Sequence, residues 1–331
     1  MTGIKDIAKK AGVSTSTVSN VLNGKKNVGE ETKNRILQIC KDMEYYPNAS
    51  GKLLKSGNSH TILFVFSDFD RSFYLRIIEG INDYVNDNGF DLIICSQKSC
   101  EKYMRSNLTS GAIILDERVK NEDIVKIARE NYHIVLLDRV IDNPFTKSVL
   151  VNNYDSMTSL VQTVIEKGYR RFGFIGGPEY TDDNKERYKA FLDTLKKNNI
   201  EFFRKNYFSG DYREKSGYRA GKIFLLSKEV PEILVCANDN MAIGAIKAFL
   251  DAGFRVPEDI AVTGFDDCDF AESANLTTVK IPDYERGYLA ARCLIENIKG
   301  DMKNMETLFI SATVRLRNSI LDKNAGVFIS K

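Results

Sequence analysis

Short hydrogen-bonding side chains are concentrated in one small stretch near the start of this 331-residue chain. They are Thr15, Ser16, Thr17, Ser19 and Asn20. An exposed helix face usually carries long lysine and glutamate side chains, whereas short polar groups let a helix approach base edges closely and form hydrogen bonds with them. The residue types in this stretch therefore favour sequence-specific contact with DNA.

Two amphipathic segments around a glycine would position these side chains. Their apolar residues are Ile4, Ile7, Ala8 and Ala11 in the first, and Val18, Val21 and Leu22 in the second. Gly12 is expected to end the first helix, because glycine adopts the left-handed conformation at little cost, and the Ser14 hydroxyl can cap the second. Two helices joined in this way form a helix-turn-helix, whose second helix can enter the major groove. A helical hairpin without DNA contact is the alternative, and the short polar face favours the DNA reader.

A third helix is predicted after the loop that follows Asn23-Gly24. Gly29 can cap it, and Glu30 and Glu31 suit the positive end of its dipole. The residues of its apolar stripe are Ile36, Ile39, Cys40 and Met43. Tyr45-Tyr46-Pro47 is expected to end it, because the residue before a proline avoids the helical conformation.

The distribution of charge supports contact with phosphates at the same end of the chain. Residues 1–57 hold ten Lys or Arg against five Asp or Glu, a net charge of +5. The whole chain has a net charge of +2, so the remainder is near −3. A basic head on a slightly acidic body is expected of a nucleic-acid-binding chain. A lysine-rich proteome would explain the lysines but not the asymmetry.

Composition predicts a soluble globular chain of two or three folding units. The chain is 43% hydrophobic and 28% charged, and it has no run near 18 consecutive apolar residues, so no membrane span is expected. Its first residues predict an amphipathic helix rather than the apolar core of a signal peptide, so we expect a cytoplasmic protein.

Cysteines and histidines predict no metal centre. The six cysteines form no Cys-x-x-Cys pair and mostly lie in apolar runs, so buried free thiols are expected rather than a zinc site. His60 and His133 each start an apolar run and are interpreted as strand-edge residues. No cofactor is expected.

From Thr61 onward, short apolar runs alternate with helical patterns. The expected strands cover residues 61–66, 90–95, 111–115, 133–137, 171–176, 232–237 and 260–265. The expected helices cover residues 73–88, 98–108, 121–131, 184–198, 213–227 and 239–252. Such alternation predicts parallel sheets covered on both faces, and two series of strands predict two similar lobes. Ligands of such sheets bind beyond the carboxyl ends of the strands, so a cleft between the lobes is the expected site.

Ordered motifs along nearly the whole chain resemble those of the LacI/GalR family of bacterial transcription regulators. The stretch Ile4–Gly24 is similar to the family's DNA-binding motif. Further similar motifs are Tyr46-Pro47-Asn48-Ala49, Gly176-Gly177-Pro178, Cys236-Ala237-Asn238-Asp239, Val256-Pro257-Glu258-Asp259, Gly264-Phe265-Asp266-Asp267 and Leu276-Thr277-Thr278-Val279. The similarity extends from residue 3 to about residue 319.

The resemblance implies an all-α helix-turn-helix headpiece and an α/β, two-lobed, periplasmic-binding-protein-like effector domain with parallel sheets and three crossovers. The implied domains are residues 1–46 (helix-turn-helix), 47–59 (hinge helix and linker) and 60–331 (effector binding and dimerisation). The first lobe would hold about residues 60–151 and 283–310, and the second about residues 152–282 and 311–331. The crossovers would lie near Asn152-Asn153, Ile281-Pro282 and Ser311–Val314.

For function, the resemblance implies a repressor that binds a near-palindromic, double-stranded operator as a homodimer and responds to a sugar or related small molecule. The DNA-binding positions are Thr15, Ser16 and Asn20 at bases, Thr17, Ser19 and Asn23 at phosphates, and Leu54 as an apolar wedge in the minor groove. The effector-binding positions are Phe73, Tyr74, Asp138, Arg187, Tyr212, Asn238 and Asp266. Carboxylates, an amide and an arginine suit vicinal hydroxyls, and aromatic faces stack on a sugar ring.

Two residues depart from the family pattern. Arginine is most frequent at the position of Asn20, and arginine pairs with guanine whereas asparagine favours adenine, so a changed base preference is expected. Gly51 costs the implied hinge helix about 1 kcal/mol relative to alanine. The hinge is therefore expected to order less readily on DNA, and a disordered tether is its alternative. The tail from Leu321 lacks leucine heptads, so a dimer is expected rather than a tetramer.

An enzyme and a solute-binding protein for transport are the alternative functions. The chain has no Gly-x-Ser-x-Gly elbow, Walker loop or dinucleotide fingerprint, and residues 172–177 are better explained as a strand and its turn. A transport protein would share the body fold, but the helix-turn-helix and the missing signal peptide argue against it.

Overall fold

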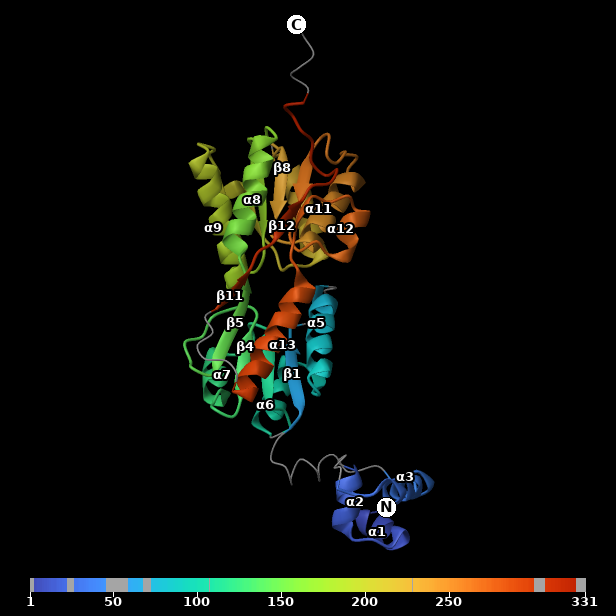
Figure 1. The fold of residues 1–331 in the computed structure, drawn as a ribbon. Helices are drawn as coiled ribbons and strands as arrows, with labels where there is room; N and C mark the ends of the chain where they lie inside the picture. The colour runs from blue at the N-terminus through green and yellow to red at the C-terminus, as the bar shows by residue number, and fades with distance from the viewer. Residues whose placement is uncertain are drawn as a thin grey trace. The chain divides into compact units, whose positions relative to one another are not determined.

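The computed structural model describes residues 3–22, 27–45, 59–67, 73–106, 108–227, 229–300 and 307–325 (Figure 1). The chain divides into two compact units, Met1–Ser59 and His60–Lys331.

The first unit contains α1 (Ile4–Ala11), α2 (Thr15–Leu22) and α3 (Glu30–Asp42). Gly12 ends α1 with a φ of 65°, and the backbone N–H of Thr17 donates to Ser14 Oγ (3.1 Å), so the predicted stop and cap are confirmed. The three helices share a core whose buried residues are Ile7, Ala8, Ala11, Val18, Val21, Ile36 and Cys40.

The end of α3 differs from the expectation. The helix ends at Asp42, because Glu44 takes a left-handed φ of 46° and the N–H of Tyr45 donates to the carbonyl of Cys40 (2.9 Å). A left-handed residue with this hydrogen bond is a helix stop that needs no proline. Tyr46 and Pro47 lie outside the described residues.

Two parallel sheets build the second unit. The first-lobe sheet has the order β11 (Leu308–Ile310), β5 (Thr146–Val151), β4 (His133–Leu136), β3 (Gly111–Leu115), β1 (Thr61–Phe66) and β2 (Asp91–Ser96). The second-lobe sheet has the order β7 (Tyr207–Ser209), β6 (Phe172–Gly176), β8 (Ile233–Cys236) and β9 (Ala261–Thr263). Every pairing in both sheets is parallel, so the predicted parallel α/β class is confirmed.

Helices cover the sheets of both lobes (Figure 1). The first-lobe helices are α5 (Phe73–Asp87), α6 (Gln97–Arg105), α7 (Asn121–Ile127) and α13 (Asp283–Lys299). The second-lobe helices are α8 (Asn153–Glu166), α9 (Asp182–Lys197), α10 (Glu214–Leu225), α11 (Asp239–Asp251) and α12 (Asp269–Ser273). Because α13 packs on α5, β3, β4 and β5, residues late in the chain complete the first lobe.

The chain passes between the lobes three times. It passes from β5 to α8, from β10 (Thr278–Lys280) to α13, and from β11 to β12 (Thr313–Arg315). β10 and β12 pair antiparallel beside the second lobe. The three crossovers are at the positions that the resemblance implied.

Candidate functional site

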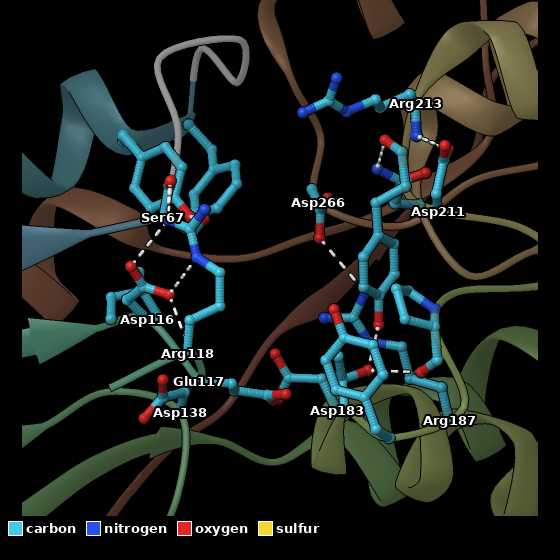
Figure 2. A pocket seen from close by; sticks show the side chains of 18 of the residues that line it. Ser67, Asp116, Glu117, Arg118, Asp138, Asp183, Arg187, Asp211, Arg213 and Asp266 are labelled. Carbon is cyan, nitrogen blue, oxygen red and sulfur yellow. Dashed lines mark hydrogen bonds and ion pairs between the residues drawn. The ribbon is translucent and has the colours of Figure 1, made fainter. Parts of the chain in front are cut away.

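A cavity of about 310 Å³ lies between the two lobes (Figure 2). Residues that follow β1, β3 and β4 line it from the first lobe, and residues that follow β6, β8 and β9 line it from the second. The carboxyl ends of parallel strands are where such sheets bind ligands. The volume falls within the roughly 300–1,000 Å³ of small-molecule sites.

All seven effector positions expected from the sequence line this cavity. They are Phe73, Tyr74, Asp138, Arg187, Tyr212, Asn238 and Asp266. The fold thus brings together side chains from segments far apart in the sequence, as a binding site requires. Their binding role stays a prediction.

Arg187, on α9, is held by several buried contacts. Its Nε donates to Asn153 Oδ1 (2.7 Å), and its Nη1 donates to the carbonyl of Ala237 and lies 3.5 Å from Asp266 Oδ1. Its guanidinium carbon lies 3.8 Å from the ring centroid of Phe265. These contacts fix the planar group in one orientation, which preorganises it for binding neighbouring oxygens.

Asn238 and Tyr212 line the cavity from the same lobe as Arg187. The Asn238 amide donates to the carbonyl of Tyr212 (2.9 Å) and accepts from the N–H of Met241 (3.1 Å), which caps α11. The Tyr212 ring packs against Gly177, where a Cβ would lie 2.2 Å from the ring. Tyr212 and Asp266 have φ values of 65° and 113°, and such strained backbone in non-glycine residues is concentrated at binding sites.

Two aromatic rings face the cavity from the start of α5. The Phe73 and Tyr74 rings stack with their centroids 4.2 Å apart. Tyr74 is buried and its hydroxyl is hydrogen-bonded to Ser67. Phe73 is half-buried, so its ring is the more accessible of the two platforms.

Several lining residues were not predicted from the sequence, and Glu117 and Asp183 are the most informative of them. Burial and the charges of Asp138 and Asp183 raise the pKa of Glu117 to about 7. Burial also raises the pKa of Asp138 to about 7, although the positive charge of Arg139 acts to lower that pKa. Glu117 follows the correctly predicted strand 111–115, so the rule that ligands bind at strand ends would have found it. No comparable local signal marks Asp183.

The outer face of α2 carries the polar side chains expected at DNA. Thr15 and Ser16 are exposed, and Thr17, Ser19 and Asn20 are half-buried. The Ser14 hydroxyl lies 2.6 Å from Ser16 Oγ and 2.9 Å from Thr17 Oγ1, which orients both hydroxyls. Asn23, Leu54 and nearly all of the expected hinge at 47–59 lie outside the described residues. Contact of these positions with DNA stays a prediction.

The cysteines agree with the expectation of free thiols. All six are free, and five of them are buried. In the described ranges, no group of three or more His, Cys, Asp or Glu residues could hold a metal ion. None of the helices in the part of the chain that the structure describes is long and apolar enough to cross a membrane.

Comparison with known proteins gives consistent results for both units. The family model described as "Bacterial regulatory proteins, lacI family" matches residues 3–48, and "Periplasmic binding protein-like domain" matches residues 161–320. The chain is 30% identical over 329 residues to the "Probable HTH-type transcriptional repressor ExuR" of Bacillus subtilis (strain 168), covering 97% of this chain and 98% of the relative.

Two solved structures have a similar fold. The lac repressor dimer bound to operator and the anti-inducer ONPF gives a TM-score of 0.84 at 24% identity, covering 96% of this chain and 98% of that chain. A complex of the transcriptional regulator CelR with cellobiose gives a TM-score of 0.72 at 25% identity, covering 96% and 100%.

Proposed function

We propose that this chain, which belongs to the LacI family of bacterial transcription regulators, is a repressor that binds a near-palindromic operator as a dimer. The repressor would respond to a sugar or related small molecule bound between its two lobes. One observation carries the proposal. A helix-turn-helix with a short polar outer face and a polar cavity lined from both lobes occur in the same chain. The proposal assigns no catalytic role and places the protein in the cytoplasm, with its DNA target.

On DNA, α2 would lie in the major groove of one half-site. Thr15, Ser16 and Asn20 would read bases, and Thr17, Ser19 and Asn23 would contact phosphates. Leu54 would insert into the minor groove at the operator centre, where an apolar wedge kinks the duplex. The net charge of +5 over residues 1–57 supports this orientation of the headpiece toward phosphates.

The effector would act by shifting a balance between lobe arrangements. A ligand that touches both lobes favours the arrangement in which both sets of contacts are made. The binding of cellobiose to CelR supports a carbohydrate as the ligand class. A change of lobe arrangement would alter operator affinity, and operator would by linkage alter effector affinity by the same factor.

Exposed apolar side chains support the dimer. In the first lobe, Leu75 on α5 and Ile94 on the edge strand β2 are 66% and 41% exposed. In the second lobe, Ile223 and Leu226 of the α10 segment and Leu250 of the adjoining α11 are 51%, 85% and 57% exposed. Apolar groups on adjoining elements typically mark interaction surfaces, and a second copy of the chain would cover these.

The first test is binding to DNA. The intact chain should select a near-palindromic sequence from randomised duplexes, and its affinity should fall steeply with salt because bound phosphates release counterions. A chain lacking residues 1–57 should lose this binding and keep its ligand-binding fold. Equal binding by both chains would contradict the proposal.

The second test is ligand binding. Sugars, sugar phosphates and nucleobases would be screened for compounds that raise the unfolding temperature, because a ligand that binds only the folded state stabilises it. A carbohydrate that binds should also change affinity for the selected operator. A screen in which only nucleobases bind would overturn the sugar class.

A further inference from the structure

The charges that line the cavity are unbalanced. The carboxylates are those of Asp116, Glu117, Asp138, Asp183, Asp211 and Asp266, and the guanidinium groups are those of Arg118, Arg187, Arg213 and Arg286. Six negative groups against four positive ones leave a formal charge of −2. A negatively charged ligand therefore enters an unfavourable field unless it meets a cation directly.

Glu117 and Asp183 contribute to this excess, as does Asp211, which accepts a hydrogen bond from the backbone N–H of Arg213 (3.0 Å). Three of the lining arginines already have carboxylate partners: Arg118 with Asp116 (2.8 Å), Arg187 with Asp266 (3.5 Å) and Arg286 with Asp283 (3.6 Å). Among the described residues, no ion pair joins Glu117 or Asp183 to a cation. Lys185, the cation nearby on α9, is exposed and pairs with Asp182 (2.8 Å).

These two carboxylates come from opposite lobes. Glu117 follows β3, and Asp183 lies in the first turn of α9. Figure 2 shows the Glu117 side chain extending toward Asp183. The raised pKa of Glu117 reflects its burial and the neighbouring charges of Asp138 and Asp183. A further negative charge placed between them would add to this repulsion.

Asp183 is fixed in position by residues behind it. Its Oδ1 accepts a hydrogen bond from Asn153 Nδ2 (2.6 Å), and Asn153 Oδ1 accepts from Arg187 Nε (2.7 Å). Asn153 directly follows the crossover from β5 and is buried. The carboxylate therefore cannot turn away from the cavity without breaking this chain of hydrogen bonds.

We propose that Glu117 and Asp183 determine the effector class: they reject compounds with an acidic group at this end of the cavity, and they accept hydrogen bonds from a vicinal diol or a protonated amine. The inference rests on the proposed function, because it concerns the same effector cavity. At pH 8, above the pKa of about 7 of Glu117, an ionised carboxylate only accepts hydrogen bonds, so a ligand phosphate or carboxylate finds no donor in either residue. The Glu117 carboxylate already accepts a hydrogen bond from the backbone N–H of Asp182 at the start of α9, and a ligand that donates to both residues would add to this link between the two lobes.

The test measures binding of the intact protein to matched sugars by thermal shift and calorimetry at pH 8. D-glucose, D-galactose and D-mannose would each be compared with the corresponding amino sugar, N-acetylated amino sugar, 6-phosphate and uronic acid, with cellobiose as a further probe. Binding is expected among uncharged or amino compounds and is expected to be at least about tenfold weaker for the acidic analogue of the best ligand. The amino sugar and its N-acetylated form distinguish an amine from a diol.

Two variants assign the selectivity to residues. Glu117→Gln and Asp183→Asn keep the side-chain size and remove the charge. Each should lower the affinity for the best ligand and reduce the ratio of its affinity to that of the acidic analogue by about tenfold. Glu122→Gln removes an exposed carboxylate on α7 outside the cavity and should leave this ratio of affinities unchanged. Unaltered circular dichroism would show that the variants fold.

Three results of these binding measurements would overturn the inference. An acidic sugar that binds the unmodified protein as well as its uncharged parent contradicts the selectivity. A selectivity that survives in both variants contradicts the role of these two residues but leaves the proposed function intact. If no carbohydrate of any charge binds, the sugar class itself fails and the inference fails with it.

Discussion

We expect single side chains to set what this regulator recognises, and Asn20 is the clearest candidate on α2. Its half-buried position beside the exposed Thr15 and Ser16 puts an amide on the face proposed to meet base edges. An amide can pair with the N6 and N7 atoms of adenine, whereas arginine would pair with the O6 and N7 atoms of guanine. The residue at position 20 should therefore choose between these bases.

Replacing Asn20 with arginine should move the preference at one operator position from adenine to guanine. A well-formed pair of hydrogen bonds to a base discriminates by about 1–3 kcal/mol. Selection from randomised duplexes would be run side by side with both proteins. The same base preference in the two selections would show that residue 20 does not read the operator.

Buried Asp239 should make stability depend on pH. It accepts hydrogen bonds from Thr278 Oγ1 (2.5 Å) and from the N–H of Cys268 (2.8 Å). Burial, followed by the charge of Asp266, raises its pKa from 3.8 to about 8. The folded protein therefore binds this proton more tightly than the unfolded chain does. The resulting stabilisation is complete below pH 3.8 and is lost as the pH rises through about 8.

The variant Asp239→Asn should reduce the fall in unfolding free energy between pH 4 and pH 8, because the amide does not titrate. Urea titrations at several pH values measure how steeply the free energy of unfolding falls with pH. The substitution Asp87→Asn at the exposed end of α5 should retain this fall. An undiminished slope in Asp239→Asn would assign the pH dependence to other groups.

At the scale of elements, each lobe contains a helix pair packed through opposed glycines. In the first lobe, a Cβ on Gly80 of α5 would lie 2.0 Å from the carbonyl oxygen of Tyr284, and one on Gly287 of α13 would lie 2.1 Å from that of Ile77. In the second lobe, Gly217 of α10 and Gly244 of α11 have the same relation to backbone of the opposite helix. Helix backbones can approach this closely only where both surfaces lack a side chain.

Substituting alanine for Gly80 should push α5 away from α13 and destabilise the protein by about 1–3 kcal/mol, the usual cost of overpacking. Urea unfolding measures the change. Glu79→Ala, at the neighbouring exposed position of α5, should cost much less. Equal stability of Gly80→Ala and the unmodified protein would mean that the helices can separate freely.

At the scale of the whole molecule, α10 should contribute to a contact between two copies of the chain. Leu226, at its C-terminal end, is 85% exposed, so a charged residue there costs the isolated chain little. In an interface the same charge would be buried without a partner, which is strongly unfavourable. The effects on folding and on association can therefore be separated at this position.

Leu226→Glu should convert the dimer to monomers in sedimentation velocity and weaken binding to a full operator, because each monomer then holds only one half-site. The matched substitution Leu316→Glu, at a position that is 53% exposed beyond β12, should leave the dimer intact. Dimers that persist in Leu226→Glu would place the interface elsewhere.

Much of this architecture follows from local patterns in the sequence. The strand at Thr61–Phe66 follows from a continuous apolar run, and the helix that starts at Phe73 follows from apolar periodicity. The stop at Gly12 follows from glycine's access to the left-handed conformation. The strands β5, β7 and β11 were not predicted. β7 and β11 have only three residues each, which carry no periodicity and are fixed by pairing with a neighbour.

Local patterns in the sequence predict a helix-turn-helix and two parallel α/β lobes, and the family resemblance adds the seven polar or aromatic residues that line one cavity. The folded structure alone shows that Glu117 and Asp183, from different lobes, face the same cavity, and that Asn153 at the crossover holds Asp183 in place. Periodicity, capping and glycine stops depend on a few neighbouring residues, so they can be predicted from the sequence. The electrostatic field inside a cavity depends on which distant segments the crossovers bring together, and no local sequence pattern specifies which segments meet.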